Sequence, residues 1–82
     1  MEQVSAGGEK VLPVSGSLYD IIIYNGGAYC SIVEPFGGDY RNKTDWKFKN
    51  TDSAKSIVYD MLRKGENMPR IKTALEKKGA II

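Results

Sequence analysis

The spacing of the apolar residues changes once along this chain of 82 residues, and that change constrains the fold more than any other feature. Before residue 50, short runs rich in isoleucine, valine and tyrosine alternate with glycine and asparagine, a pattern typical of β-strands joined by turns. From residue 51 onward, apolar side chains recur at the spacing of an amphipathic helix. Strands followed by helices predict an α+β fold, a single antiparallel β-sheet with two C-terminal helices packed on one face.

The clearest strand is Leu18–Tyr24, and Ala28–Val33 is expected to return beside it as a hairpin partner. Asn25-Gly26-Gly27 between them tolerates the positive φ that a tight turn needs. A short edge strand is predicted over Val11–Val14, because it contains Pro13 and proline cannot donate to a central ladder. Alternation of apolar and basic residues predicts a half-buried strand over Trp46–Lys49.

Three segments carry weaker patterns. Residues 1–10 have no period and two glycines, so a loose arm is expected there. Residues 37–45 are rich in polar and turn residues, which favours a loop. The apolar residues at positions 80–82 could add a short last strand, so the predicted sheet has three to four strands.

Two helices are predicted in the second half. Thr51 or Asp52 can accept the free amides at the start of the first helix, and Pro69 suits the first turn of the second. Gly65 and Gly79 should end them. The apolar helix residues expected to pack against Ile21, Ile23 and Val33 are Ala54, Ile57, Val58, Met61, Leu62, Ile71, Ala74 and Leu75.

Composition narrows the classes of function. A chain of this length suits one small domain over residues 1–82. The absence of histidine excludes a Ser-His-Asp triad and a His-ligated zinc, and the single cysteine, Cys30, allows neither an internal disulfide nor a Cys-rich metal site. No apolar run approaches the ~20 residues of a membrane span. We therefore expect a cytoplasmic, non-enzymatic protein with no metal, cofactor or small-molecule substrate and no membrane contact.

Side-chain alternation predicts an exposed face on the sheet. If the hairpin loop holds three residues, one face of the two strands carries both carboxylates, and an unpaired charge beneath two helices would be costly. That face should point outward as an apolar patch rimmed by polar groups, which is typical of interaction surfaces. An even loop would break this grouping. The residues assigned to the face are Asp20, Ile22, Tyr24, Cys30, Ile32 and Glu34.

Charge is divided unevenly along the chain and leaves two partner classes open. Residues 1–41 contain five acids and two bases, whereas residues 42–82 contain ten bases and five acids. The acidic half could face a basic protein surface, and the basic half could face nucleic acid. Trp46-Lys47-Phe48-Lys49 interleaves aromatic and basic residues as single-strand binders do. Their alternation on opposite faces of a strand instead favours buried aromatics and solvated lysines.

Four segments of the chain resemble a small phage anti-CRISPR protein family that inhibits the type I-F CRISPR surveillance complex. The similarity extends over residues 18–78 with closely matching spacing, and the family shares the predicted arrangement of an antiparallel sheet and two helices. The segments are Tyr19–Gly27, the pair Val33-Glu34, the helix start Thr51-Asp52-Ser53, and Arg70-Ile71.

The resemblance implies binding to the basic, nucleic-acid-lining backbone subunits of that complex, which blocks target DNA from pairing with the guide RNA. The family's binding tyrosine and glutamate, at the ends of the two hairpin strands, match Tyr24 and Glu34. A further family tyrosine near the N-terminus has no counterpart in Val11–Val14. The expected function is a protein-binding inhibitor that does not bind DNA directly. The alternative is a small nucleic-acid-binding module that uses the basic C-terminal half.

Overall fold

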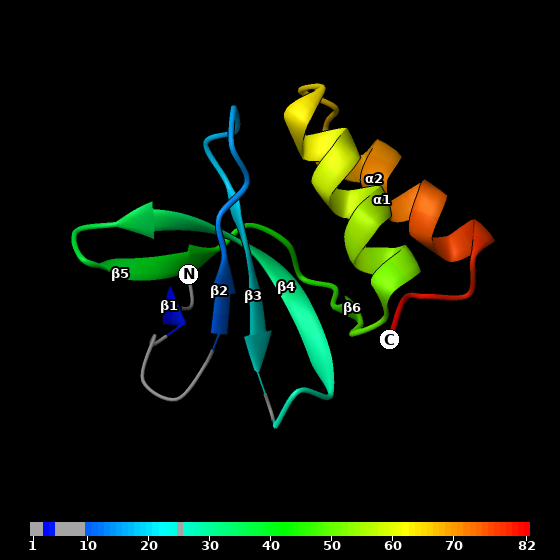
Figure 1. The fold of residues 1–82 in the computed structure, drawn as a ribbon, viewed down its shortest axis with the longest axis horizontal. Coiled ribbons are helices and arrows are strands. Elements are labelled where there is room, and N and C mark those ends of the chain that lie inside the picture. The colour runs from blue at the N-terminus through cyan, green and yellow to red at the C-terminus, as the bar shows by residue number, and fades with distance from the viewer. Residues whose placement is uncertain (1–2, 5–9, 25) are drawn as a thin grey trace.

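The fold is an α+β arrangement of one antiparallel sheet and two C-terminal helices, as the sequence predicts (Figure 1). The structure is a computed structural model that describes residues 3–4, 10–24 and 26–82, with the backbone alone at residues 3, 4 and 24. The elements are β1 (Gln3–Val4), β2 (Lys10–Leu12), β3 (Asp20–Tyr24), β4 (Tyr29–Phe36), β5 (Asp39–Asn42), β6 (Phe48–Lys49), α1 (Asp52–Arg63) and α2 (Met68–Lys77).

The strands lie in the order β1-β5-β4-β3-β2. β6 lies off this path and pairs with Tyr29 and Cys30, the first residues of β4. The two longest ladders are β3–β4 and β4–β5, so β4 is the central strand of the sheet. β2 is an edge strand that shares Val11 and Leu12 with the prediction, but it ends before Pro13. The last residues return to β6 through a bridge between Phe48 and Ile81, which confirms the expected short final pairing.

The helices begin and end where local chemistry dictates. The Thr51 side chain accepts the Ala54 amide at 3.2 Å, which confirms the predicted cap of α1. Asn67 caps α2 in the same way by accepting the Arg70 amide at 3.1 Å. Gly65 and Gly79 follow the two helices with positive φ, as expected. Within the described part of the chain, neither helix is long and apolar enough to cross a membrane.

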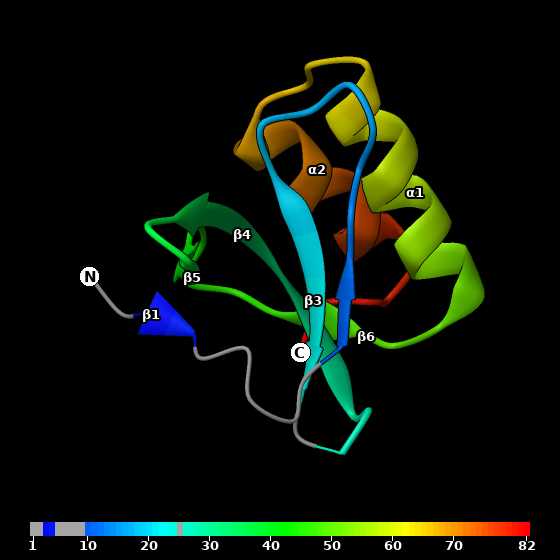
Figure 2. The same cartoon turned by 60° about the vertical axis from the view of Figure 1, so that its left-hand side comes forward.

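Both helices cover the same side of the sheet, here called the helix face, and the opposite side is the far face (Figures 1 and 2). Most of the predicted helix core is confirmed, because Ile57, Met61 and Ala74 are half-buried and the other five residues are fully buried. Ile21 and Ile23 contribute from the sheet. The cluster of buried residues contains Val14, Ile21, Cys30, Ile32, Phe48, Ala54, Val58, Leu62, Ile71, Leu75 and Ala80.

A second, smaller cluster lies on the far face. Ile22 and Val33 are fully buried there, with Val11 and Tyr40 packed against them. The prediction that Val33 packs beneath the helices is therefore wrong. Val33 lies opposite Asp20 in the β3–β4 register, so its side chain shares the face of Asp20 and Ile22.

The loop and arm predictions need correction in two places. β5 occupies part of the predicted loop 37–45, because Gly37 and Gly38 adopt the positive φ values, 57° and 85°, that let β4 turn directly into an antiparallel partner. β1 lies within the predicted arm and pairs with β5, and Lys10 opens β2. The rest of the predicted arm lies outside the described residues.

Candidate partner-binding surface

The predicted binding face depends on the β3–β4 register, and that register separates its members. Tyr24 lies opposite Tyr29, so four residues, 25–28, join the paired ends rather than three. The even loop shifts the return strand by one residue, which moves each of its side chains to the other face. Asp20, Ile22 and Tyr24 therefore belong to the far face. Cys30, Ile32 and Glu34 belong to the helix face, and the predicted grouping is wrong.

Three members of the predicted face cannot meet a partner. Ile22 and Ile32 each have 0% of their surface exposed, and they lie in different core clusters. Cys30 is equally buried, and this burial raises the pKa of its thiol to about 11, although the Lys55 ammonium acts to lower it. All three side chains stabilise the fold through the contacts they make in the interior.

Asp20 has a local structural role. It is half-buried, and its carboxylate accepts the backbone amide of Val14 at 3.3 Å, which fixes the connection between β2 and β3. Tyr24 lies at the end of β3, and its side chain falls outside the described residues. A binding role for Tyr24 therefore stays a prediction.

Glu34 directly follows the four buried residues of β4, where the strand becomes exposed. Its side chain is 34% exposed, and Oε1 is 3.5 Å from Nζ of Lys43, which is 27% exposed. Arg41 is directly opposite Glu34 in the β4–β5 register. The carboxylate is thus held by a neighbouring cation on a regular pair of strands while a third of its side chain remains in contact with solvent.

Glu34 is the centre of a line of side chains that we call the Glu34 row. At one end, Nζ of Lys43 lies 5.9 Å from the centre of the Tyr19 ring. At the other end, Cζ of Arg41 stacks 3.7 Å above the ring of Phe36, whose surface is 47% exposed. The row consists of Tyr19, Lys43, Glu34, Arg41 and Phe36.

The contacts within the row hold its long side chains in place. Cation–π stacking of arginine on an aromatic ring is worth about 0.5–1 kcal/mol at exposed sites, and here it orders a side chain that would otherwise sample many rotamers. Arginine and aromatic residues are enriched in protein–protein interfaces. The row therefore has the composition and the order of a surface that another protein can recognise.

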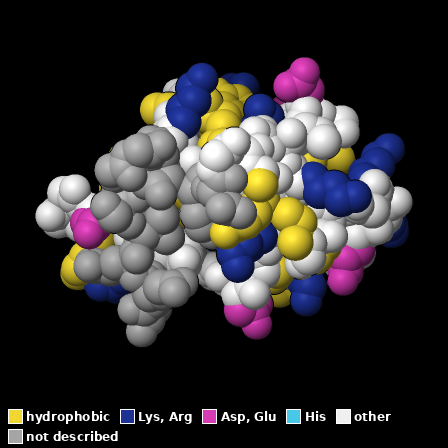
Figure 3. Space-filling model, turned by 90° about the horizontal axis from the view of Figure 1, so that it is seen from below, with side chains coloured by type: hydrophobic (Ala, Val, Ile, Leu, Met, Phe, Trp, Pro, Cys, Tyr) yellow, Lys and Arg dark blue, Asp and Glu magenta, His cyan; other side chains and the backbone are white. Residues whose placement is uncertain are grey.

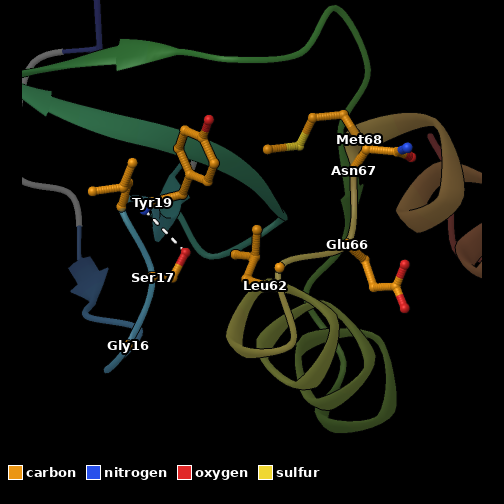
Figure 4. A pocket seen from close by; sticks show the side chains of 9 residues that line it. Gly16, Ser17, Tyr19, Leu62, Glu66, Asn67 and Met68 are labelled. Atoms are coloured by element: carbon orange, nitrogen blue, oxygen red, sulfur yellow. Dashed lines mark hydrogen bonds between the residues drawn. The ribbon is translucent and has the colours of Figure 1, made fainter.

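The row ends at a concavity between two connecting segments (Figure 4). Its volume is about 460 Å³, and it lies between the β2–β3 connection and the segment that joins α1 to α2. Tyr19 and Met68 extend toward each other across it, and Leu62 lies below them (Figure 4). The Ser17 hydroxyl accepts the Tyr19 amide at 3.1 Å, which fixes the backbone at this end of the row.

The charges of the Glu34 row differ from those of the acidic surface that the sequence predicts. Arg41 and Lys43 flank Glu34, so cations outnumber the carboxylate within the Glu34 row. Figure 3 looks from below onto the end where the β3–β4 hairpin turns, and basic and acidic side chains are interspersed there. The expectation of an acidic, apolar-centred face is therefore wrong, because its apolar members are buried and its two carboxylates lie on opposite faces of the sheet.

Four members of the row were missed by sequence reasoning. Gly37-Gly38 is itself a hairpin signal, and it would have placed Phe36 and Arg41 near each other across a turn. No local pattern points to Lys43 or Tyr19, since they meet only through the pairing of three strands. In the described parts of the chain, no group of three or more acidic or cysteine side chains could hold a metal ion.

Comparison with known proteins finds no family model, no curated protein and no solved structure that matches this chain. The likeness to the anti-CRISPR family therefore rests on the sequence alone. Of its two binding residues, the structure describes the side-chain contacts of Glu34 but not those of Tyr24.

Proposed function

We propose that the protein is a non-enzymatic inhibitor, a phage anti-CRISPR, that binds the backbone subunits of a CRISPR surveillance complex and blocks pairing of target DNA with the guide RNA. The observation that carries the proposal is the position of Glu34. The glutamate that the family resemblance marks for binding has a third of its side chain exposed, at the centre of an ordered row of basic and aromatic side chains.

The geometry at Glu34 leaves room for a cation from a partner. Nζ of Lys43 is 3.5 Å from Oε1, and among the described residues no other side chain forms an ion pair with this carboxylate. A lysine or arginine that lines a nucleic-acid channel could approach Oε2 and make a charge-assisted hydrogen bond. Occupying such a cation would remove a side chain that otherwise contacts nucleic acid, which is how a small protein can block DNA pairing without any chemistry.

The proposal assigns binding to the Glu34 row and treats Tyr24 as a separate contact. Glu34 and Tyr24 belong to opposite faces of the sheet, so one flat partner surface cannot cover both. A contact at Tyr24 would need a second surface of the partner or of a neighbouring subunit. The two residues can therefore be tested independently.

The test is the affinity of variants for a purified type I-F surveillance complex. Truncating an interface anchor typically costs about 2 kcal/mol or more, which is roughly thirtyfold in affinity. We expect Glu34→Ala to weaken binding and inhibition by about this factor, with little change in thermal stability. The matched control is Glu76→Ala, which removes an exposed carboxylate from α2 and should bind like the unsubstituted protein. Lys77→Ala, on the same helix, should also be neutral.

Two outcomes would overturn the assignment. Unchanged affinity of Glu34→Ala, with a loss confined to Tyr24→Ala, would place the binding surface on the far face. No affinity of the unsubstituted protein for the complex would overturn the proposed function itself.

A further inference from the structure

A second concavity lies beside the Glu34 row, and we call it the Trp46 cleft. It has a volume of about 730 Å³ and separates the segment between β5 and β6 from the first turn of α2. Lys43 belongs to both the row and the cleft. The residues that line the cleft are Asn42, Lys43, Thr44, Asp45, Trp46, Met68, Pro69 and Lys72.

Trp46 provides a fixed aromatic surface in this cleft. Its ring is half-buried against the core, with its centre 6.5 Å from that of Phe48. The Thr44 hydroxyl donates to the Trp46 carbonyl at 2.8 Å, which holds the irregular backbone in place. Met68 and Pro69 supply apolar side chains from α2. An indole ring and two apolar side chains therefore form part of the wall of the cleft.

Lys72 supplies a positive charge to the cleft. The side chain is half-buried in the cleft, and within the described residues no carboxylate pairs with it. Lys43 adds a second ammonium, which is shared with Glu34. A partly desolvated cation without a counter-ion is unfavourable, and an anionic ligand would relieve that cost. Asp45, exposed at the rim, opposes anions only in part.

We propose that the Trp46 cleft binds single-stranded nucleic acid, with a base stacked on Trp46 and backbone phosphates beside Lys72 and Lys43. A nucleotide combines a planar ring with an anion, which matches this pairing of groups, whereas an acidic peptide side chain offers no ring. Paired bases inside a duplex are not available for such stacking. The proposal departs from the expectation that the protein does not bind DNA directly, and it does not depend on the inhibitor function, because it concerns the protein alone.

The experiment exploits the fact that Trp46 is the sole tryptophan of the chain. Its fluorescence is followed during titration with an oligouridylate of about ten nucleotides, within the range that one small binding domain covers. We expect saturable quenching that weakens with salt, with a log–log slope of about −1.4 for two neutralised phosphates at ~0.7 each. Inorganic phosphate should quench little, and duplex DNA should not compete.

Charge variants identify the groups involved. Lys72→Ala should reduce the slope to about −0.7, because one phosphate contact is lost. Lys72→Arg should retain the slope, since the charge remains. The matched control is Lys78→Ala, an exposed lysine beyond the end of α2 that does not line the cleft. Asp45→Asn should tighten binding, because it removes from the rim a negative charge that repels the phosphates.

The proposal is overturned if the oligouridylate leaves the fluorescence unchanged at low salt, or if Lys78→Ala and Lys72→Ala alter the slope equally. Quenching by polyglutamate but not by the oligonucleotide would also overturn it, in favour of an acidic protein partner. Affinity for the surveillance complex is measured separately, so failure here leaves the proposed inhibitor function untouched.

Discussion

The two halves of β4 have opposite roles within one strand. Its first half, from Tyr29 to Val33, includes four fully buried residues and supplies side chains to both core clusters. Its second half, Glu34–Phe36, becomes progressively exposed and carries two members of the Glu34 row. The alternation of side chains is the same in both halves, so coverage by other elements makes the difference.

β4 is longer than the helix α1 that packs over the same sheet. An eight-residue strand spans about 26 Å at ~3.3 Å per residue, whereas the twelve-residue α1 spans about 18 Å at ~1.5 Å per residue. With β5, the second half of β4 forms a hairpin that projects from the body of the protein (Figure 1). The buried half anchors that hairpin, and the projecting half presents the row to solvent.

The largest expected effect is in the buried half. Ile32→Ala should lower the free energy of unfolding by about 2–5 kcal/mol, the range for truncating a core isoleucine. Phe36→Ala, in the projecting half, should cost less than about 1 kcal/mol, because its ring is half-exposed. Urea denaturation of the two variants measures both values. Equal losses at the two positions would show that the hairpin is not separate from the core.

The far face gives the next largest effect. Ile22 is fully buried in the second cluster, so Ile22→Ala should cost about 2–4 kcal/mol in the same denaturation experiment. The odd-loop register would instead leave this side chain in solvent, where truncation is nearly neutral. A change within experimental error would therefore restore the sequence-based register and contradict the described pairing of Tyr24 with Tyr29.

Cys30 reports on the integrity of the buried half through its reactivity. Burial raises the pKa of this thiol to about 11, so the reactive thiolate is scarce in the folded protein near neutral pH. We expect labelling by a thiol-specific disulfide reagent at pH 8 to be at least about 100-fold slower than in urea, since ~2 pKa units separate the folded and unfolded thiols. Because the folded pKa is the higher one, Cys30 also favours folding below pH 9 and loses that contribution as pH rises toward 11. Rapid labelling of the native protein would show that this half opens easily.

The smallest expected effect concerns the pair at the tip of the projecting half. A double-mutant cycle of Phe36→Ala and Arg41→Ala should give a coupling energy of about 0.5–1 kcal/mol, the value of an exposed cation–π contact. Arg41→Lys should retain part of the coupling. A coupling near zero would mean that the Arg41 side chain is mobile and that this end of the row is not preordered.

The helices and the fold class were predictable because their signals are local. Thr51, Gly65 and the three-to-four spacing of apolar residues each act within a few positions of the chain, and all appear in the structure where expected. The core under the helices follows from the same spacing. Sequence alone was therefore sufficient for the layer of helices and for its inward face.

The candidate site was less predictable because it depends on register. One extra residue in the turn, Ala28, moves Ile32 and Glu34 to the helix face. The strand propensities of the residues do not determine how many of them form the turn. β5 was not predicted because Tyr40 is the one apolar side chain in Asp39–Asn42, too few for an alternating pattern, and the strand is held by its pairing to β4. Lys43 and Tyr19 meet only after three strands have paired.

The most direct test of the Glu34 row is site-specific photocrosslinking from the two halves of β4. Benzoylphenylalanine replaces Phe36 in one variant and Tyr29 in the other, so each aromatic ring gives way to a similar one. Tyr29 lies opposite Tyr24 and so marks the far face. After irradiation with a type I-F surveillance complex, we expect the Phe36 variant to crosslink to a backbone subunit. A Phe36 variant that does not crosslink, beside a Tyr29 variant that does, would contradict binding through the Glu34 row.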